Sequence, residues 1–418
     1  MNDKYFLVTK SHIVKAKNMT HARALVDGDE DVLGDVLADK LLTQEVNYEE
    51  AVTHFGVANN QVFAEDYDSI DDNELPRDLA APSAIQSSTV DFLRTENKRL
   101  ARLVDRYKNV RDEAGHIVYQ AAYDAFNEFE LPKIPKPSFP KSSSTSETAV
   151  AVLADWQMGK VTPDYNTEVL AKRMDLYMDK LIEITNIQRT HHPVKNLHVW
   201  ILGDIVEGEE IFPGQSHLID SGIYRQVGVN GPKILGNFLK TALEHFEHVH
   251  VTAVIGNHGA VGGRMRKQHD PETNMDRLLY KICEMIFESE GRISFNIPDG
   301  KGERNWYAVD YIGSYGTLLI HGYQMPSPSA THGYYKKVMG WKDGAIPERF
   351  DDVFMGHYHQ QAKMTLGSTI LRVSGSPESY NTYAQEYFHS MSRPCQHLMF
   401  VHPDHGVTSE YSIWLDQV

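Results

Sequence analysis

The stretch LHVWILGDIVEG, residues 197–208, decides the fold of the larger part of this chain. Its mostly apolar first half predicts a buried strand, which Gly203 and Asp204 end. The stretches AVAVLAD (residues 149–155) and VTAVIGNH (residues 251–258) repeat this pattern of a buried run that ends in polar residues. Because helical patterns separate the three runs, the order predicts an α/β arrangement.

The remaining elements of residues 148–418 follow from the same signals. Helices are predicted at 168–190, 232–246 and 275–289, where apolar residues recur at helical spacing. The later part is rich in strands, which are predicted at 306–312, 315–320, 352–355, 369–373, 396–401 and 409–414. We therefore expect an α/β half followed by a β-rich half, packed as sheets between helices.

Polar side chains follow five of these strands, where open α/β sheets place their ligands. Each of them alone would be an ordinary turn or cap residue. Together they are the oxygen and nitrogen ligands that two neighbouring ions need, including a carboxylate that bridges both. The residues are Asp155, Gln157, Asp204, Glu207, Asn257, His258, His321, His357 and His359.

Composition limits what the chain can be. Its two cysteines form no Cys-x-x-Cys pair, so a cysteine-rich zinc module is excluded, whereas 21 histidines allow a His, Asp and Asn site. No apolar run reaches the ~18 residues of a membrane span, and no signal peptide is recognisable, so we expect a cytoplasmic protein that contacts no membrane. The net charge of −16 is concentrated in residues 1–80, which carry 17 acidic and 7 basic side chains. Nucleic acid remains an allowed partner of the less acidic remainder.

The chain from Val150 to about Val401 resembles the calcineurin-like metallophosphoesterases. The motifs of that family are Asp-x-His, Gly-Asp-x-x-(Asp/Glu), Gly-Asn-His-(Asp/Glu), His-Gly and Gly-His-x-His, and their counterparts occur here in the same order, with one residue changed in the first and in the third. The resemblance implies a four-layer α/β/β/α sandwich with a centre for two divalent ions. It also implies attack on phosphorus by a hydroxide that bridges the ions, with His258 as the general acid.

The resemblance further implies which residues hold each ion, with Asp204 shared by both. One ion would be held by Asp155, Gln157, Asp204 and His359. The other would be held by Asp204, Asn257, His321 and His357.

Two residues depart from the family pattern. Gln157 stands where His is usual, and its harder, neutral oxygen favours Mn²⁺, or Mg²⁺, over Zn²⁺. Gly259 stands where an acidic residue normally orients the catalytic histidine, so His258 would be held less firmly unless another carboxylate, such as that of Glu207, replaces it.

Within the family, the motifs look most like the SbcD-type DNA-repair nucleases, including phage-encoded members. This likeness implies a Mn²⁺-dependent DNA nuclease. Exonuclease and endonuclease action stay open, because that branch often has His at the position of Glu207. Candidate contacts to DNA are Arg264, Arg266, Lys267, His217 and Glu207, with Lys336 and Lys337 beside the aromatic residues Tyr334, Tyr335 and Trp341.

Two alternatives stand beside the nuclease. A phosphohydrolase that acts on nucleotides or phosphoproteins is motivated by Gln157, which also occurs in some nucleotide-pyrophosphatase branches, and by the acidic charge. A non-catalytic DNA-binding or polymerase-accessory subunit is motivated by Gly259 alone. The partners that we expect are single- or double-stranded DNA, a second copy of the chain and a separate ATPase, since the chain has no phosphate-binding Gly-rich loop of its own.

The N-terminal third predicts four further segments. Residues 1–63 are expected to form a small α/β unit with a strand-like stretch at 5–14 and helices at 19–25 and 32–42. An acidic linker follows at 64–86. Residues 87–130 are predicted to be a helical region, either a coiled coil or an amphipathic helix packed on its own domain. A Pro/Ser-rich linker at 131–147 leads into the domain at 148–418.

Overall fold

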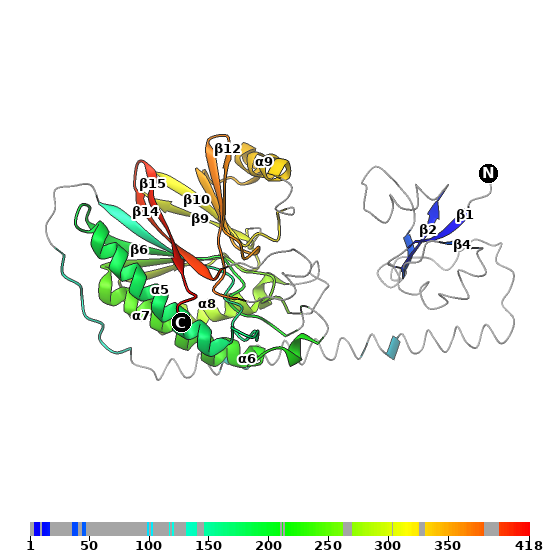
Figure 1. Cartoon of the computed structure of the whole chain (residues 1–418), viewed down its shortest axis with the longest axis horizontal. Coiled ribbons are helices and arrows are strands. Elements are labelled where there is room, and N and C mark those ends of the chain that lie inside the picture. Colours follow the sequence, from blue (N-terminus) through cyan, green and yellow to red (C-terminus); the bar gives the residue numbers. More distant parts are fainter. Residues whose placement is uncertain are drawn as a thin grey trace. The chain divides into compact units, whose positions relative to one another are not determined.

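The computed structural model describes residues 4–8, 11–16, 36–40, 44–46, six residues between 98 and 120, and 131–139. From residue 146 to residue 418 it describes all but 210, 212–213, 262–269, 303, 326–330 and 380–392. The chain divides into two compact units, residues 1–96 and residues 97–418. Figure 1 shows both units.

The described part of the first unit is a four-stranded antiparallel sheet. It consists of β1 (Lys4–Val8), β2 (Ser11–Ala16), β3 (Val36–Lys40) and β4 (Gln44–Val46), in the order β3-β2-β1-β4. The predicted helix at 32–42 is wrong, because pairing with β2 holds residues 36–40 extended despite their helical spacing. The predicted helix at 19–25 lies outside the described residues.

The predicted helical region 87–130 is described only at residues 98, 99, 102, 117, 119 and 120, which are all helical. The apolar spacing that motivated a coiled coil therefore falls mostly on residues outside the description. Residues 131–139 form neither helix nor strand. Within them the ring of Phe139 lies 5.0 Å from the guanidinium of Arg189 and 6.0 Å from the ammonium of Lys195, which attaches this segment to the following domain.

The first of the two larger sheets contains the three buried runs that begin the stretches 149–155, 197–208 and 251–258. The strands β5 (Glu147–Leu153), β6 (Val194–Ile201), β7 (His248–Ala253) and β8 (Ile293–Asn296) are parallel. The antiparallel strands β14 (Cys395–His402) and β15 (Gly406–Trp414) complete the order β15-β14-β5-β6-β7-β8.

The second sheet has five strands in the order β12-β13-β11-β10-β9. They are β9 (Tyr307–Ile312), β10 (Tyr315–Ile320), β11 (Asp352–Met355), β12 (Ala362–Leu366) and β13 (Thr369–Val373). Because β10, β11 and β13 are parallel, the carboxyl ends of β10 and β11 meet at one edge.

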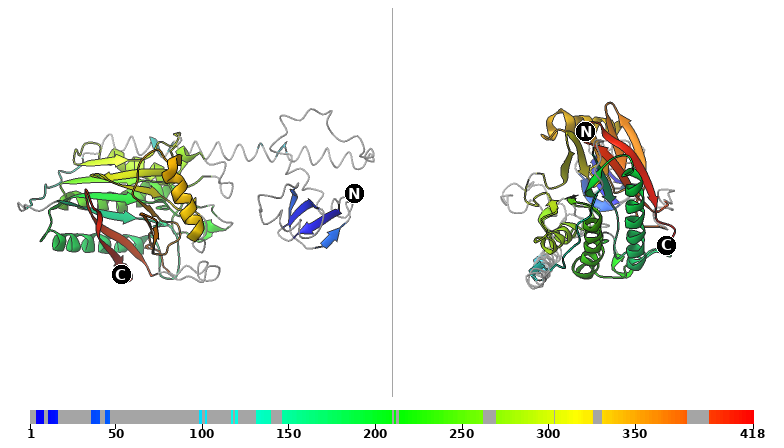
Figure 2. Two further views of the ribbon diagram at one scale, coloured as in Figure 1. Left: turned by 90° about the horizontal axis from the view of Figure 1, so that it is seen from above. Right: turned by 90° about the vertical axis from the view of Figure 1, so that its left-hand side faces the viewer.

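The helices pack on the outer faces of the two sheets, as Figures 1 and 2 show. α5 (Thr167–Gln188), α7 (Gly231–His245) and α8 (Met275–Ile286) share a hydrophobic cluster with the first sheet. α9 (Thr331–Gly340) packs on the second sheet. A third cluster joins the sheets face to face through alternate residues of their strands, such as Val152, Trp200 and Phe354.

Short helical turns border the loops of the first sheet. They are α6 (Ile223–Arg225), the π-helical turn Gln226–Asn230 and the 3-10 turns Gln215–His217 and Pro271–Thr273. A further π-helical turn, Trp341–Ala345, extends α9. Side chains cap two of the long helices, since Asn166 accepts from the N–H of Val169 and Asn274 from that of Asp276.

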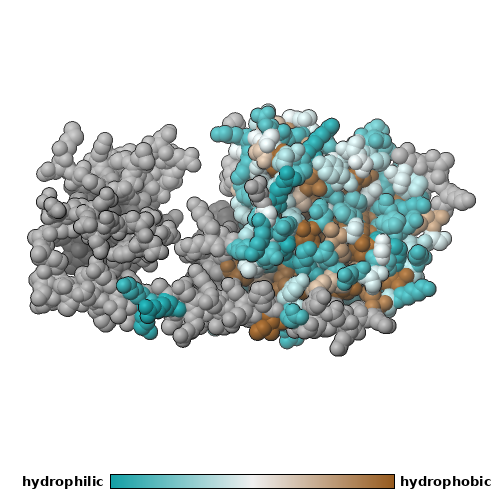
Figure 3. Space-filling view, turned by 180° about the vertical axis from the view of Figure 1, so that it is seen from behind, coloured by the Kyte–Doolittle hydropathy of each residue, from teal (hydrophilic) through white to brown (hydrophobic). Residues whose placement is uncertain are grey.

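Every strand and long helix predicted after residue 147 is present within a few residues of its expected bounds. Apart from the short helical turns, three elements of this part were not predicted. Strands β8 (ISFN) and β12 (AKMTL) alternate apolar and polar residues but are only four and five residues long, and α9 has the mixed sequence THGYYKKVMG. On the face in Figure 3, hydrophobic residues are interspersed with hydrophilic ones. Among the described residues, no helix has the length and apolar character needed to cross a membrane.

Candidate metal centre

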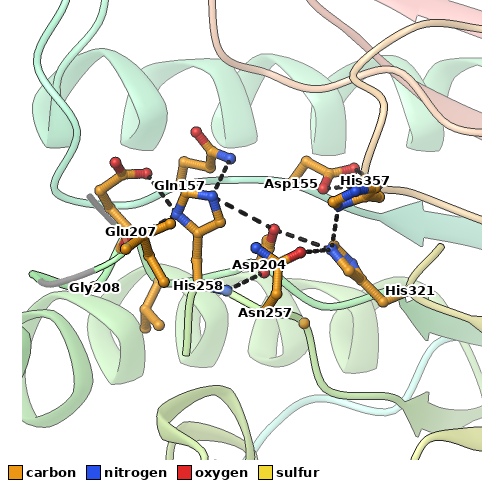
Figure 4. A network of polar contacts seen from close by, with 12 residues as sticks. Asp155, Gln157, Asp204, Glu207, Gly208, Asn257, His258, His321 and His357 are labelled. Atoms are coloured by element: carbon orange, nitrogen blue, oxygen red, sulfur yellow. Dashed lines mark hydrogen bonds and ion pairs between the residues drawn. The ribbon is translucent and has the colours of Figure 1, made fainter. Parts of the chain in front are cut away.

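The polar residues predicted from the strand ends come together at one edge of the two sheets (Figure 4). They follow β5, β6 and β7 in the first sheet and β10 and β11 in the second. Since the sheets pack face to face and these strands are parallel within each sheet, their carboxyl ends lie side by side.

The backbone at this edge is strained at several of the predicted ligands. The non-glycine residues with positive φ in the described chain are five of the predicted ligands: Asp155 (53°), Gln157 (43°), Asp204 (51°), His357 (75°) and His359 (56°). A positive φ disfavours any side chain with a Cβ, and such strain is typical of functional sites. The loops are therefore shaped to aim these side chains inward rather than to relax the backbone.

The glycines before the ligands permit close approach of the strand ends. A Cβ on Gly203 would lie 2.4 Å from the backbone nitrogen of Gly256, and one on Gly256 would lie 2.1 Å from Oδ1 of Asp204. A Cβ on Gly356 would lie 2.5 Å from Oδ2 of Asp155. Only Gly203 among these three has a positive φ, so close packing, more than turn geometry, explains the glycines.

One group of predicted ligands is arranged as a cation site. Nε2 of His321 lies 3.0 Å from Oδ2 of Asp204 and 3.2 Å from both Oδ1 of Asn257 and Nδ1 of His357. Nδ1 of His321 donates to the backbone oxygen of Leu202 at 2.7 Å, which leaves Nε2 to face the other atoms. Asp204, His321 and His357 offer ligand atoms within 4.8 Å of one another.

The electrostatics of this group favour positive charge. Burial alone would lower the pKa of His321, but the carboxylate of Asp204 outweighs it and raises the pKa to about 9. Burial alone would raise the pKa of Asp204, but His321 and His258 hold it well below its ordinary value. Carboxylate, amide oxygen and imidazole nitrogens that converge at a largely buried position of this polarity fit a divalent ion.

The other group of predicted ligands lies beside the first. Nε2 of His359 is 3.7 Å from Oδ1 of Asp155 and 3.0 Å from Nε2 of Gln157. The carboxylate of Asp155 accepts the backbone N–H of His357, and burial raises its pKa to about 6. Asp155 and His359 fit an ion, whereas the amide of Gln157 directs its nitrogen, not its oxygen, toward His359.

Glu378 and Lys160 surround this second group, and the sequence analysis missed both. Oε2 of Glu378 lies 2.8 Å from Nδ1 of His359, and Oε1 lies 2.6 Å from Nζ of Lys160. Burial opposes the charge of Glu378, but Lys160 and His359 lower its pKa to about 2. Ser376 of the same loop donates to the backbone oxygen of Asp155 at 2.7 Å. The carboxylate of Glu378 accepts from Nδ1 of His359 and so fixes this ring in the tautomer whose Nε2 faces the site.

Glu207 takes the place of the missing carboxylate at position 259. Nδ1 of His258 lies 2.9 Å from the backbone oxygen of Glu207 and 3.2 Å from its Oε2. Gln215 in turn donates to Oε1 of Glu207 at 2.8 Å. Burial would lower the pKa of His258, but Asp204 and Glu207 raise it to about 10. Nε2 of His258 is thereby turned into the site, 3.9 Å from Oδ2 of Asp204.

Asp276 holds the loops of β6 and β7 together, and it too was missed. Its carboxylate lies in the first turn of α8 and accepts four backbone N–H groups, from Asp204, Ile205, Val206 and Gly256, at 2.9–3.1 Å. Neither Asp276 nor Glu378 follows a predicted strand directly, so no local pattern marks them. The Asn-x-Asp start of α8 was the one available signal, and it predicts only a helix cap.

The residues predicted to contact substrate differ in their exposure, and three of them lie outside the described residues. Arg264, Arg266 and Lys267 lie outside the described residues. Glu207 is buried against His258, whereas His217 is exposed in the turn Gln215–His217. The predicted stacking by Tyr334 and Trp341 is wrong, because both rings are buried in the cluster under α9. Tyr335 and Lys336 are exposed, and Nζ of Lys337 bonds the backbone oxygen of Gln324.

Comparison with known proteins gives likenesses of structure only. No protein-family model matches the chain, and no curated protein matches it. Among solved structures, Vps29 from Entamoeba histolytica, in a crystal structure with Zn²⁺, is similar at 13% identity and a TM-score of 0.29 over 63% of this chain and 98% of that chain.

Two further structures are similar to the same extent. A structure described as a novel archaeal phosphodiesterase has 12% identity and a TM-score of 0.28, over 63% of this chain and 99% of that chain. A hypothetical protein from Pyrococcus horikoshii has 13% identity and a TM-score of 0.32, over 65% of this chain and 89% of that chain. With identities and TM-scores this low, a functional assignment has to rest on the residues of the site.

Proposed function

We propose that this chain is a metal-dependent phosphodiesterase built on a four-layer α/β/β/α metallophosphoesterase sandwich. The observation that carries the proposal is the position of Asp204, whose carboxylate lies 3.0 Å from Nε2 of His321 in one group of ligands and whose backbone oxygen accepts the N–H of Gln157, in the other group, at 2.9 Å. A buried carboxylate between two groups of ligands is what a pair of ions requires as a bridge. The packing of helices outside two facing sheets supports the sandwich.

The two groups of ligands would each hold one divalent ion. Asp155, Gln157, Asp204 and His359 would hold one, and Asp204, Asn257, His321 and His357 the other. When bound, the ions would polarise a phosphoryl oxygen and make water nucleophilic near neutral pH. The amide oxygens of Gln157 and Asn257 are hard, neutral ligands, which favours Mn²⁺, with Mg²⁺ as the alternative.

His258 would be the general acid. Its Nδ1 is engaged by Glu207, so the proton available to a substrate is on Nε2, which faces Asp204 and Gln157 at 3.9 Å and 3.5 Å. Donation of this proton to the leaving oxygen would avoid release of an alkoxide. Gly259 no longer favours a non-catalytic role, because Glu207 contacts the ring that an acidic residue at 259 would have oriented.

DNA is the substrate that we propose, cleaved as a Mn²⁺-dependent exonuclease or endonuclease. Support comes from the motif likeness to the SbcD-type nucleases and from the basic residues after the third motif. A second copy of the chain and a separate ATPase are the proposed protein partners, by the same likeness. A phosphohydrolase of nucleotides or phosphoproteins is the alternative for the same centre.

The test is digestion of end-labelled single- and double-stranded DNA in Mn²⁺ by the wild type and by His258→Ala at several salt concentrations. We expect the wild type to release label and the variant to lose roughly 10²–10⁴-fold in rate. The rate on DNA should fall steeply with salt, because backbone contacts release counterions. Intact DNA together with rapid, salt-insensitive cleavage of a dinucleotide would instead favour the nucleotide hydrolase.

A further inference from the structure

The two ion positions differ in what surrounds their ligands. At the position of Asp204, Asn257, His321 and His357, the facing atoms include two oxygens and two imidazole nitrogens. At the position of Asp155, Gln157 and His359, an ammonium group lies within contact of a ligand. Nζ of Lys160 is 2.9 Å from Oε1 of Gln157, the one oxygen that this side chain can offer to an ion.

An ion pair with Glu378 holds the side chain of Lys160 beside Gln157. Oε1 of Glu378 lies 2.6 Å from Nζ of Lys160, and the side chain of Glu378 is 1% exposed. The backbone adds a second constraint, because the N–H of Lys160 donates to the oxygen of Gln157 in a tight turn through Gly159, whose φ is 106°. Lys160 therefore stays beside Gln157.

Lys160 also fixes which way the amide of Gln157 points. An ammonium has three donors and no acceptor, so the oxygen of Gln157 must face it. The nitrogen of Gln157 then lies 3.0 Å from Nε2 of His359, whose Nδ1 is held by Glu378. The amide thus donates to the nitrogen that His359 would use to bind an ion. For Gln157 to bind an ion through oxygen, the amide would have to turn and place its N–H₂ against the ammonium.

We propose that Lys160, held by Glu378, makes the two ion positions unequal, so that the Asp204–Asn257–His321–His357 position binds tightly and the Asp155–Gln157–His359 position binds weakly. The inference rests on the proposed two-ion centre and adds an order of binding to it. Two physical effects act together at the weaker position. The ammonium presents the positive end of its ion pair with Glu378 to the oxygen of Gln157, and the amide must give up two hydrogen bonds before it can become a ligand.

The experiment is a titration of the metal-stripped full chain with Mn²⁺, followed by calorimetry and by electron paramagnetic resonance of the free ion. We expect one Mn²⁺ to bind tightly and a second at least ~10-fold more weakly. Lys160→Met should tighten the second step by at least ~10-fold and leave the first unchanged. Lys160→Arg, which keeps the charge, should retain the inequality.

Lys172→Met is the matched control, because it removes a lysine whose ion pair with Glu168 is exposed on α5. Thermal melting establishes that each variant is folded, and Lys160→Gln gives the same comparison should Lys160→Met unfold. Two equal steps in the wild type, no Mn²⁺ binding, or an unchanged second step in the uncharged variants would overturn the inference. Unequal binding of the two ions without cleavage of any phosphodiester would support the inequality and contradict the proposed function. Cleavage of a phosphodiester together with two equal binding steps would support the proposed function and contradict the inequality.

Discussion

At the scale of single residues, the contact between Glu207 and His258 is the one that bears most directly on catalysis. We expect Glu207→Gln to lower kcat on a small phosphodiester in Mn²⁺ by up to about 10-fold, with KM nearly unchanged, because the variant loses the carboxylate charge beside Nδ1 of His258 but keeps the backbone oxygen that also orients the ring. Full kinetics with bis(p-nitrophenyl) phosphate measure the effect. Glu168→Gln on exposed α5 is the control. A loss confined to KM would mean that Glu207 contacts substrate instead.

Gly259 leads to a prediction in which a carboxylate is added instead of removed. Restoring an acidic residue by Gly259→Asp should not improve activity, because a Cβ there would lie 2.6 Å from Oδ1 of Asn274 and 2.8 Å from the backbone nitrogen of Asp276. We expect the variant to lose about 1–3 kcal/mol of unfolding free energy. Urea denaturation of Gly259→Asp beside Gly291→Ala, where a Cβ meets nothing within 4 Å, would show the difference. A stable and more active variant would refute this explanation of the glycine.

At the scale of elements, α8 supports the centre through Asp276. In Asp276→Asn an amide group would replace a carboxylate oxygen that accepts backbone N–H groups, so buried donors would face a donor. We expect a loss of about 1–3 kcal/mol of stability and weaker Mn²⁺ binding, since the loops after β6 and β7 would separate. Melting and Mn²⁺ titration measure the two effects, with the exposed Asp179→Asn as control. Unchanged Mn²⁺ affinity would show that the loops hold their shape without the carboxylate.

Strand β9 carries another buried carboxylate, that of Asp310, outside the metal loops. Asp310 accepts from Trp200 at 2.6 Å, lies 2.6 Å from Nδ1 of His198 and contacts Thr252, so it ties β9 to β6 and β7. Burial opposes its charge, but His198, His250 and Trp200 hold its pKa well below the ordinary value. Such a carboxylate adds stability above its unfolded pKa of about 3.9, and the gain is lost as pH falls below that value.

Asp310→Asn should therefore be less stable than the wild type at neutral pH, and the difference should shrink as pH falls below about 4. Urea denaturation across pH 3–7 gives the comparison, with Asp179→Asn again as the exposed control. A difference that is constant across this range would mean that the shape of the side chain matters and its charge does not.

The sequence predicted the strands and the inward-facing ligands because both depend on local pattern. A buried run ends at a polar residue, and parallel strands bring such ends to one edge, as for Asp155 and Asp204. The supporting residues depend on contacts between distant segments, for example Glu378 with Lys160 and Asp276 with Asp204. Strand β3 shows the converse, since pairing with β2 overrides a helical spacing. Local periodicity carries no information about such pairings.

At the scale of the whole molecule, the described ligands all belong to the unit of residues 97–418. We expect the fragment 97–418 to bind Mn²⁺ and to cleave a small phosphodiester as the full chain does, because the described ligands and the described residues of the three hydrophobic clusters lie within it. Loss of either property in a folded fragment would show that residues 1–96 complete the centre.

DNA should distinguish the fragment from the full chain. Residues 1–96 carry 19 acidic and 8 basic side chains, so their removal leaves a less negative protein. Phosphate backbones repel net negative charge, and the repulsion is screened by salt. The fragment should therefore bind DNA more tightly than the full chain at low salt, and the two should converge as salt rises. Fluorescence anisotropy with a labelled duplex measures both curves. Weaker binding by the fragment at every salt concentration would instead assign a DNA contact to the N-terminal unit.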